Sequence, residues 1–209
     1  YATNLVAGDT NGVSDVFVKG LASGAVTRVS VGPGGRQGNS YSGYPSFSPG
    51  SGRIAFISYA SNLGPPDDSS SLSVFQRSLG ATNDMTMINI RSDGKQALFQ
   101  NNWRPLWSPS GTTVVFLSIQ DGVVPADNNH LLDIYQRAFG SAQTSLLSRT
   151  NAGGVLNGAS TDPAFAGTSG VFAFASLASN IVAQDTNGFL DVFVRDLAKR
   201  TTVRVSTRV

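Results

Sequence analysis

Aspartates and asparagines at a fixed spacing are the residues of this sequence best suited to metal chemistry. The pattern Asp-x-Asn-x-x-x-Asp occurs three times, as Asp9, Asn11 and Asp15, as Asp127, Asn129 and Asp133, and as Asp185, Asn187 and Asp191. Calcium takes about six to eight hard oxygen ligands, and carboxylates and amide oxygens supply them. No lysine or arginine falls within residues 5–15, 121–133 or 181–191. The pattern therefore predicts structural calcium (Ca²⁺) sites that stiffen these loops.

The same residues also fit tight turns that bind no metal. Asn11 and Asn187 are each followed by glycine, and Asn-Gly favours a tight turn. An aspartate can also cap its own turn through its side chain. The repeated pattern lacks the central aspartate of the usual calcium-loop consensus. Turn formation and calcium binding both stay open at this point.

A second group of candidate residues precedes an equivalent proline in each repeat and differs in chemistry. Tyr44, Arg104 and Asp162 each stand directly before such a proline, and Tyr41 and Trp103 lie close by in the sequence. Variation at an equivalent position is what a specific binding site requires. These five residues are predicted to lie near the mouth of a central channel and to bind a partner. The competing interpretation is a salt bridge between Arg104 and Asp162.

The sequence gives little support for catalysis. It contains no cysteine and no glutamate, which leaves aspartates as the only carboxylate side chains. His130 is the only histidine, and it stands between Asp127 and Asp133, where it could act as a base. No nucleophile motif accompanies it, and a histidine in a polar loop is more often solvated. We expect a non-catalytic protein; the alternative is a hydrolase or lyase with an aspartate-based site that includes Asp162.

An internal repeat places these residues on a common framework. Residues 6–30 and 182–206 are identical at 15 of 25 positions, and weaker copies lie between them. The repeat sets the aromatic residues Phe17, Phe75, Tyr135 and Phe193 at spacings of 58, 60 and 58 residues. Each complete repeat contains four short runs rich in β-branched and aromatic residues, separated by glycine-rich turns. Four-stranded antiparallel sheets at such a period predict an all-β protein of the β-propeller class.

The repeat also divides the chain into blades, whose strands we name A to D from the inside outward. Residues 1–31 supply a half-blade with strands C and D only, and residues 45–90, 105–149 and 163–206 supply complete blades within one domain, 1–209. About three and a half blades are too few for a closed ring. We therefore expect the missing blades upstream of Tyr1 or on another chain, where they would pair with the open edge at 15–19. The B–C and D–A connections are long and emerge on one face, which is the predicted binding face.

One phrase of the repeat resembles a known family. Pro45-Ser-Phe-Ser-Pro-Gly-Ser-Gly-Arg-Ile-Ala-Phe56 is similar to the WD40-like (PD40) repeat of TolB-like propellers, and 105–116 and 163–174 are further copies. All three copies lack the usual aspartate of the A–B turn. The resemblance covers nearly the whole chain. It implies a propeller from a family that includes envelope proteins that bind partners, propellers associated with peptidases, and secreted proteins.

Composition limits the remaining classes of function. A formal net charge of +2 is too small for a nucleic-acid-binding surface, and the sequence contains no membrane-spanning stretch. A cysteine-free chain rich in Ser, Thr, Asn and Gly suits a secreted or periplasmic bacterial protein. We expect a binding module that presents its long loops to a protein or glycan partner. A purely structural role beside a catalytic domain is a further alternative.

Overall fold

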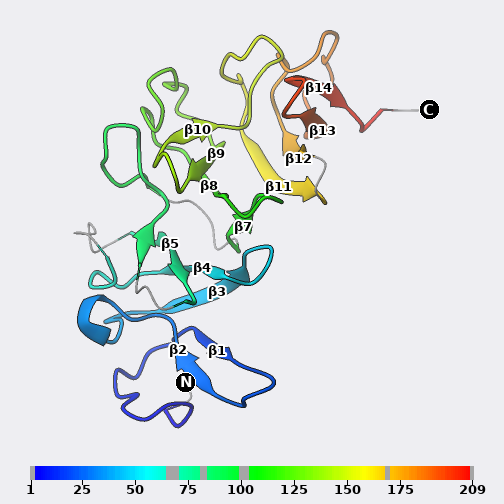
Figure 1. Cartoon of the computed structure of the whole chain (residues 1–209). Helices are drawn as coiled ribbons and strands as arrows, with labels where there is room; N and C mark the ends of the chain where they lie inside the picture. The colour runs from blue at the N-terminus through cyan, green and yellow to red at the C-terminus, as the bar shows by residue number, and fades with distance from the viewer. Residues whose placement is uncertain (1–2, 65–70, 81–83, 99–103, 168–169, 208–209) are drawn as a thin grey trace. The chain divides into compact units, whose positions relative to one another are not determined.

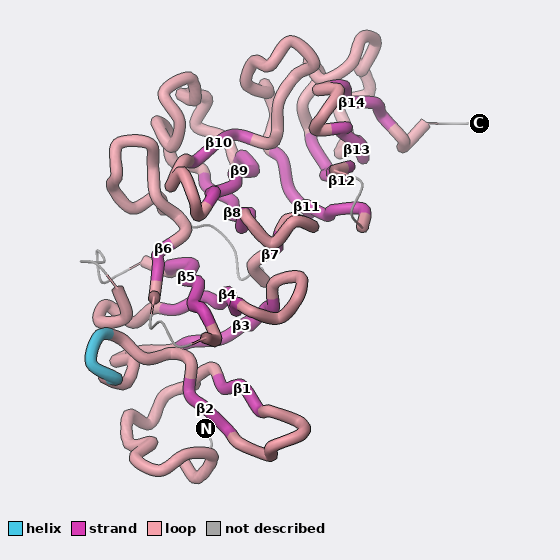
Figure 2. Tube along the Cα trace, viewed as in Figure 1, coloured by secondary structure: helices cyan, strands magenta, loops and turns pink. Residues whose placement is uncertain are grey.

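The computed structural model describes residues 3–64, 71–80, 84–98, 104–167 and 170–207. The chain forms two compact units, and each is described by itself. Unit 1 comprises residues 1–89 and 102–105, and unit 2 comprises residues 90–101 and 106–209. Figure 2 shows strands and loops, with one short helical turn, η1 (Pro33–Gly35), in cyan. No helix among the described residues is long and apolar enough to cross a membrane.

Both units are built from antiparallel sheets whose strands follow chain order. Unit 1 contains a two-stranded sheet, β1-β2, and a four-stranded sheet, β3-β4-β5-β6. Unit 2 contains two four-stranded sheets, β7-β8-β9-β10 and β11-β12-β13-β14 (Figure 1). This topology is that of propeller blades and confirms the predicted all-β propeller class. The strands are β1 (Phe17–Lys19), β2 (Val26–Arg28), β3 (Ser42–Phe47), β4 (Arg53–Ser58), β5 (Ser73–Ser78), β6 (Thr86–Met87), β7 (Leu106–Trp107), β8 (Thr113–Ser118), β9 (Asp133–Ala138), β10 (Thr144–Leu146), β11 (Ser160–Ala166), β12 (Val171–Ser176), β13 (Asp191–Asp196) and β14 (Thr201–Arg204).

The second and third strands of each complete blade lie inside the sheet, and all of them are six residues long. Each B strand (β4, β8, β12) pairs over six residues with the C strand that follows it. This register places an aromatic residue opposite an aromatic residue: Phe56 opposite Phe75, Phe116 opposite Tyr135, and Phe174 opposite Phe193. Their ring centroids lie 6.0, 5.5 and 5.7 Å apart. Cross-strand aromatic pairs therefore fix the register of every complete blade.

Strand lengths depart from the sequence expectation at the sheet edges. The β-rich runs of the repeat predict strands over 85–90, 105–108 and 26–31, and the structure forms only the shorter β6, β7 and β2 there. All three are edge strands, each with a partner on one side only. The strand predicted at 163–166 is longer than expected, because β11 begins at Ser160 and continues through an irregularity between Thr161 and Ala164.

The hydrophobic core of unit 2 joins its two blades. Ile134 and Leu147 of one blade share a buried cluster with Phe172, Phe174 and Phe193 of the next. The adjoining backbone is also bonded across the blades, because the Ser160 N–H donates to the Leu132 carbonyl at 2.7 Å. Blade-on-blade packing thus buries apolar side chains of both blades, as expected of a repeat protein.

Arginines at the end of each complete C strand tie consecutive blades together. Arg77 donates to the Val29 carbonyl at 2.9 Å, and Arg137 and Arg195 likewise donate to main-chain carbonyls of the preceding repeat. Burial lowers the pKa of all three guanidinium groups. These arginines are structural connections between repeats.

Replacing Gly158 with alanine is expected to lower the free energy of unfolding by about 2 kcal/mol. A Cβ at this position would overlap the main chain at Leu177 and Ala178, which cannot move as easily as the end of a side chain. Urea unfolding followed by circular dichroism measures the change. Gly140 is the matched control, since a Cβ there meets no atom within 4 Å. Equal stability of both variants would contradict the close approach.

Candidate functional site

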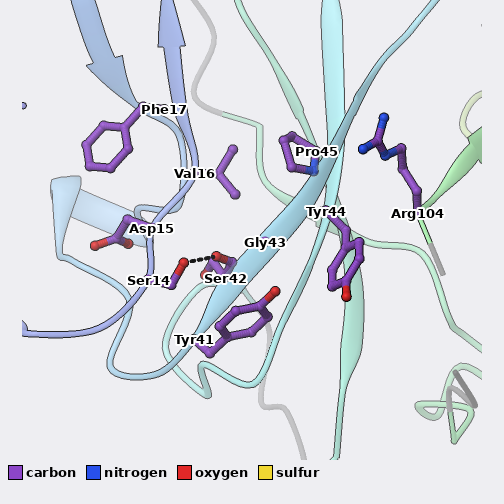
Figure 3. Close-up of a pocket in the computed structure, with 10 residues that line it drawn as sticks. All are labelled: Ser14, Asp15, Val16, Phe17, Tyr41, Ser42, Gly43, Tyr44, Pro45 and Arg104. Atoms are coloured by element: carbon purple, nitrogen blue, oxygen red, sulfur yellow. Dashed lines mark hydrogen bonds between the residues drawn. The ribbon is translucent and has the colours of Figure 1, made fainter. Parts of the chain in front are cut away.

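A cleft in unit 1 brings several predicted binding residues together. Its volume is about 390 Å³, and it is lined by three chain segments: residues 14–17, which lead into β1, residues 41–45 at the start of β3, and Arg104 (Figure 3). The first two segments are joined at their base, because the Ser42 N–H donates to the Ser14 carbonyl at 2.7 Å and the Ser14 hydroxyl donates to the Ser42 carbonyl at 3.2 Å. The base of the cleft is therefore supported by one hydrogen bond between main chains and one from the Ser14 side chain.

Tyr44 enters this cleft from a β-bulge. The pairing of β3 with β4 shifts between Gly43 and Ser46, and Tyr44 adopts a left-handed backbone with φ of 52°. A bulky residue rarely takes this conformation, and bulges commonly redirect a side chain. Asp162 in β11 occupies the equivalent bulge, with φ of 53°. The repeat therefore keeps the bulge and changes the side chain that it presents.

The tyrosines form an aromatic surface beside the bulge. The rings of Tyr41 and Tyr59 lie 6.3 Å apart, and Tyr44 and Tyr59 are each about two-fifths exposed. Burial, followed by the neighbouring Tyr44 and Tyr59, raises the pKa of Tyr41. Gly43 lets the Tyr41 side chain fold back over the strand, because a Cβ at Gly43 would overlap the Tyr41 hydroxyl. The surface offers apolar ring faces together with phenolic hydroxyl groups.

The structure places the five predicted binding residues as follows. Tyr41, Tyr44 and Arg104 line one cleft, and Arg104 is exposed to solvent. Asp162 is exposed on β11 in unit 2. Trp103 lies outside the described residues. Sequence reasoning did not assign residues 14–17 to the cleft, although the open strand that it predicted over 15–19 marks the same segment.

One edge of strand β1, beside this cleft, has no partner strand among the described residues. The strand pairs with β2 alone and has three residues, whereas the three complete C strands have six. Phe17 is half-buried, while the equivalent Phe75, Tyr135 and Phe193 are fully buried by the B strand of their own blade. In the described part of the chain, no aromatic ring stacks on Phe17 in the way that Phe174 stacks on Phe193.

The Asp/Asn pattern forms a turn in all three loops. In each loop, the asparagine amide nitrogen donates to the second aspartate: Asn11 to Asp15 at 2.9 Å, Asn129 to Asp133 at 2.7 Å, and Asn187 to Asp191 at 2.8 Å. The asparagine carbonyl oxygen accepts the N–H two residues later. The asparagine oxygen is therefore used within the turn.

An arginine from strand D pairs with the aspartates in two of the loops. Arg28 lies 3.1 Å from Asp9 and 3.5 Å from Asp15. Arg204 lies 2.8 Å from Asp185 and 3.3 Å from Asp191. The cation that the local sequence lacks is thus supplied from about 13 to 19 residues further along the chain. A guanidinium group satisfies a carboxylate pair through its directed N–H groups.

The third loop has no such arginine, because Leu146 stands at the equivalent position. Its blade carries Tyr135 where the others have phenylalanine, and the Tyr135 hydroxyl donates to Asp127. Asp127 is buried, and its Oδ1 accepts no hydrogen bond from the described residues. Burial and the neighbouring Asp133 raise the pKa of Asp127 to about 6, against the opposing effect of the Asn129 N–H. Burial likewise raises the pKa of Asp133.

These contacts do not fit calcium in the two loops that contain an arginine. The third loop offers two carboxylates, and the described residues hold no group of three acidic or histidine side chains arranged for a metal ion. The geometry favours turns and ion pairs. Calcium binding stays a prediction, which titration of the protein with calcium would test.

His130 does not contact the aspartates that the sequence suggested. Its Nδ1 lies 2.6 Å from Oδ2 of Asp121, and its side chain is 84% exposed. Its backbone N–H donates to the same carboxylate at 2.9 Å, which holds the residue in a turn with φ of 57°. An exposed histidine in a turn is a weak candidate for a catalytic base.

Comparison with known proteins gives similarity in structure alone. No protein-family model matches the sequence, and no curated protein sequence matches it. Among solved structures, the chain is similar to the tricorn protease, with 11% identity and a TM-score of 0.31 over 94% of this chain and 21% of that one. It is also similar to a putative TolB from Agrobacterium tumefaciens, with 12% identity and a TM-score of 0.35 over 90% of this chain and 72% of that one. The chain spans about a fifth of the tricorn protease, and its assignment to the β-propeller class rests on the order of strands in its own sheets.

Proposed function

We propose that this protein is a non-catalytic β-propeller binding module, and that the unit 1 cleft holds its partner. The observation that carries the proposal is the joint lining of this cleft by Tyr41, Tyr44, Arg104 and the segment that leads into the open strand β1. Tyrosine and arginine are enriched where binding energy is concentrated. The left-handed backbone at Tyr44 adds support, since such strained positions often present functional side chains.

Among the described residues, the edge of β1 opposite β2 has no strand beside it, which favours pairing with an extended strand, supplied by residues that precede Tyr1 or by a protein partner. Exposed main-chain groups at a sheet edge accept another strand, and alternate side chains then give specificity. The complete blades indicate the partner's chemistry. Their B strands read apolar, Ala or Val, Phe, apolar, Ser over positions 54–58, 114–118 and 172–176. A partner strand of this pattern would set its phenylalanine opposite Phe17.

A second copy of this chain is a poor source of that strand. Its B strands, β4, β8 and β12, each already pair on both edges within their own sheets. A glycan is the second candidate, because sugar rings stack on tyrosine and arginine binds their acidic groups. The cysteine-free composition, rich in Ser, Thr, Asn and Gly, supports a secreted or periplasmic location for this protein with either partner.

A peptide with the sequence of residues 171–176, flanked by lysines for solubility, is expected to bind unit 1. Replacement of the phenylalanine equivalent to Phe174, or of Phe17 itself, by alanine should weaken binding at least about tenfold. Fluorescence anisotropy measures the affinity, and hydrogen exchange at residues 15–19 should slow when the peptide binds. Leu21→Ala is the control, since this nearby side chain is almost fully exposed.

Variants of the cleft separate the two kinds of partner. Tyr44→Ala and Arg104→Ala are expected to weaken binding of the true partner while unfolding stays unchanged, because both side chains are exposed. If a glycan panel gives binding that depends on Tyr44 and Arg104 while the peptide fails, the partner is a glycan. If neither probe depends on these residues, the cleft is not the binding site.

A further inference from the structure

A cleft in unit 2 gathers three arginines without a carboxylate. Its volume is about 520 Å³, and it is lined by residues of β9, β10 and the loop after β10, and by residues of β13 and the turn after it. Arg149, Arg195 and Arg200 line the cleft, and none of its lining residues is acidic. Asp196, which is close in sequence, is paired with Lys199 at 3.2 Å.

The preceding repeat provides an internal comparison for these arginines. The isolated bridges Ile90–Gln96 and Arg149–Val155 show that Ile90 is equivalent to Arg149. Ala142 is equivalent to Arg200, because both have left-handed backbones in the turns after their C strands, with φ of 51° and 59°. Of the three arginines, only Arg195 has an arginine as its equivalent, Arg137.

The two kinds of arginine have different roles. Arg195 is 5% exposed and donates to the Arg149 and Thr150 carbonyls and to the Thr202 hydroxyl, so it connects repeats as Arg137 does. Arg149 and Arg200 are additions to that framework. They replace an apolar and a small residue, and packing between blades does not require them, since the preceding repeat folds with Ile90 and Ala142.

The added charges are costly without a counter-ion. Burial lowers the pKa of Arg195, and the charges of Arg149 and Arg200 lower it further. Nε of Arg149 is buried and has no hydrogen-bond partner among the described residues. Like charges that cluster in a partly buried place destabilise the folded state unless an opposite charge joins them. The cleft therefore combines unmatched positive charge with an unused donor.

We propose that this cleft binds an oxyanion, a phosphate or sulfate group carried by a larger molecule. Guanidinium groups bind such oxygens through paired N–H donors. Arg149 and Arg200 provide the anion contacts, and the buried Arg195 adds positive charge to the lining of the cleft. The cleft is larger than an inorganic anion, so the rest of the ligand occupies its remaining volume. This site is independent of the cleft proposed in unit 1.

Binding of inorganic phosphate, sulfate and phenyl phosphate tests the proposal. Isothermal titration calorimetry is run in chloride buffers of constant ionic strength, because electrostatic binding weakens with salt. The Arg149→Ile/Arg200→Ala double variant restores the residues of the preceding repeat. It is expected to lose at least about tenfold in affinity for each anion that binds. Phenyl phosphate should bind more tightly than inorganic phosphate.

Two controls keep the outcome interpretable. Lys95→Ala removes an exposed cation that does not line the cleft and should leave anion affinity unchanged. Arg200→Ala alone alters an exposed turn residue, and Ala142 shows that alanine accepts this backbone, so loss of affinity there is not explained by unfolding. Unchanged anion affinity in the double variant would overturn the proposal, as would wild-type protein that binds neither phosphate nor sulfate.

Discussion

Replacement of Arg204 by leucine is expected to destabilise the protein by more than the roughly 1 kcal/mol of a surface ion pair. Arg204 is the cation that pairs with Asp185 and Asp191, whose side chains are about one-twentieth exposed. Its removal leaves two buried carboxylates with neither a cation nor enough water. Breaking a buried pair from one side is costly because the remaining charge is uncompensated.

The third loop suggests how this loss can be repaired. It tolerates Leu146 at the equivalent position because the Tyr135 hydroxyl donates to Asp127. Adding Phe193→Tyr to Arg204→Leu reproduces that arrangement, since Phe193 is equivalent to Tyr135. The double variant should regain about 1 kcal/mol, the usual net value of one hydrogen bond.

Urea unfolding of the wild type, the single variant and the double variant measures both effects. Lys199→Ala is the control, because its ion pair with Asp196 is on the surface and contributes less than about 1 kcal/mol. A loss for Arg204→Leu no larger than that for Lys199→Ala would show that the arginine does not compensate the carboxylates. Absence of recovery in the double variant would show that the hydroxyl is not an equivalent partner.

The sequence was sufficient to predict the sheets because their pairing follows the repeat. Phe75, Tyr135 and Phe193 recur at one position, and each is opposite an aromatic residue of the preceding strand. Side chains alternate between faces along a strand, so one fixed aromatic position determines the register of the whole blade. Edge strands carry no such pair, and their ends were the least well predicted.

The partners in the acidic loops could not be predicted from local sequence. Residues 5–15 and 181–191 contain clusters of aspartate without a lysine or arginine, and this pattern suggested calcium. The cation comes from strand D, where Arg28 and Arg204 return beside the loop as the hairpin closes. The signal was available in the repeat, since this arginine is identical in both strong copies and is leucine in the third. It becomes meaningful only when the fold shows which strand lies beside the loop.

The unit 1 cleft was predicted in part for a similar reason. Tyr44 and Arg104 stood out because equivalent positions carried different side chains. The left-handed bulge that presents Tyr44 depends on a register shift between β3 and β4. No residue type in the sequence indicates this shift. The arginine cleft of unit 2 required the equivalence of Arg149 with Ile90, and that follows from a bridge between main chains.

The stability of the protein is expected to carry a pH dependence that originates at Asp127. Burial and the neighbouring Asp133 raise the pKa of Asp127 in the folded protein to about 6, whereas its ordinary pKa is 3.8. Between these values the folded state binds more protons than the unfolded state. The contribution of Asp127 to stability is therefore fully present below pH about 4 and is lost as pH rises through about 6. A difference of about two pKa units corresponds to a loss of about 3 kcal/mol.

The Asp127→Asn variant isolates this contribution. An amide has the shape of a protonated carboxyl group and does not ionise, and its oxygen can accept the Tyr135 hydroxyl proton. The variant should match the wild type at pH 4 and exceed it by up to about 3 kcal/mol at pH 7. Urea unfolding at pH 4, 5, 6 and 7 gives the difference between the two proteins, which cancels the titration of shared groups that do not interact with Asp127.

Asp191→Asn provides a control of opposite sign. Hydrogen bonds from Ser206 and Asn187, together with Arg204, lower the pKa of Asp191. Its contribution is present at neutral pH and is lost as pH falls through that lowered value, so its replacement should be most harmful at pH 7. The two equivalent loops therefore predict opposite pH trends from aspartates in the same pattern, because one loop has an arginine and the other has Leu146. A parallel dependence in both variants would show that the arginine does not determine the charge state of these loops.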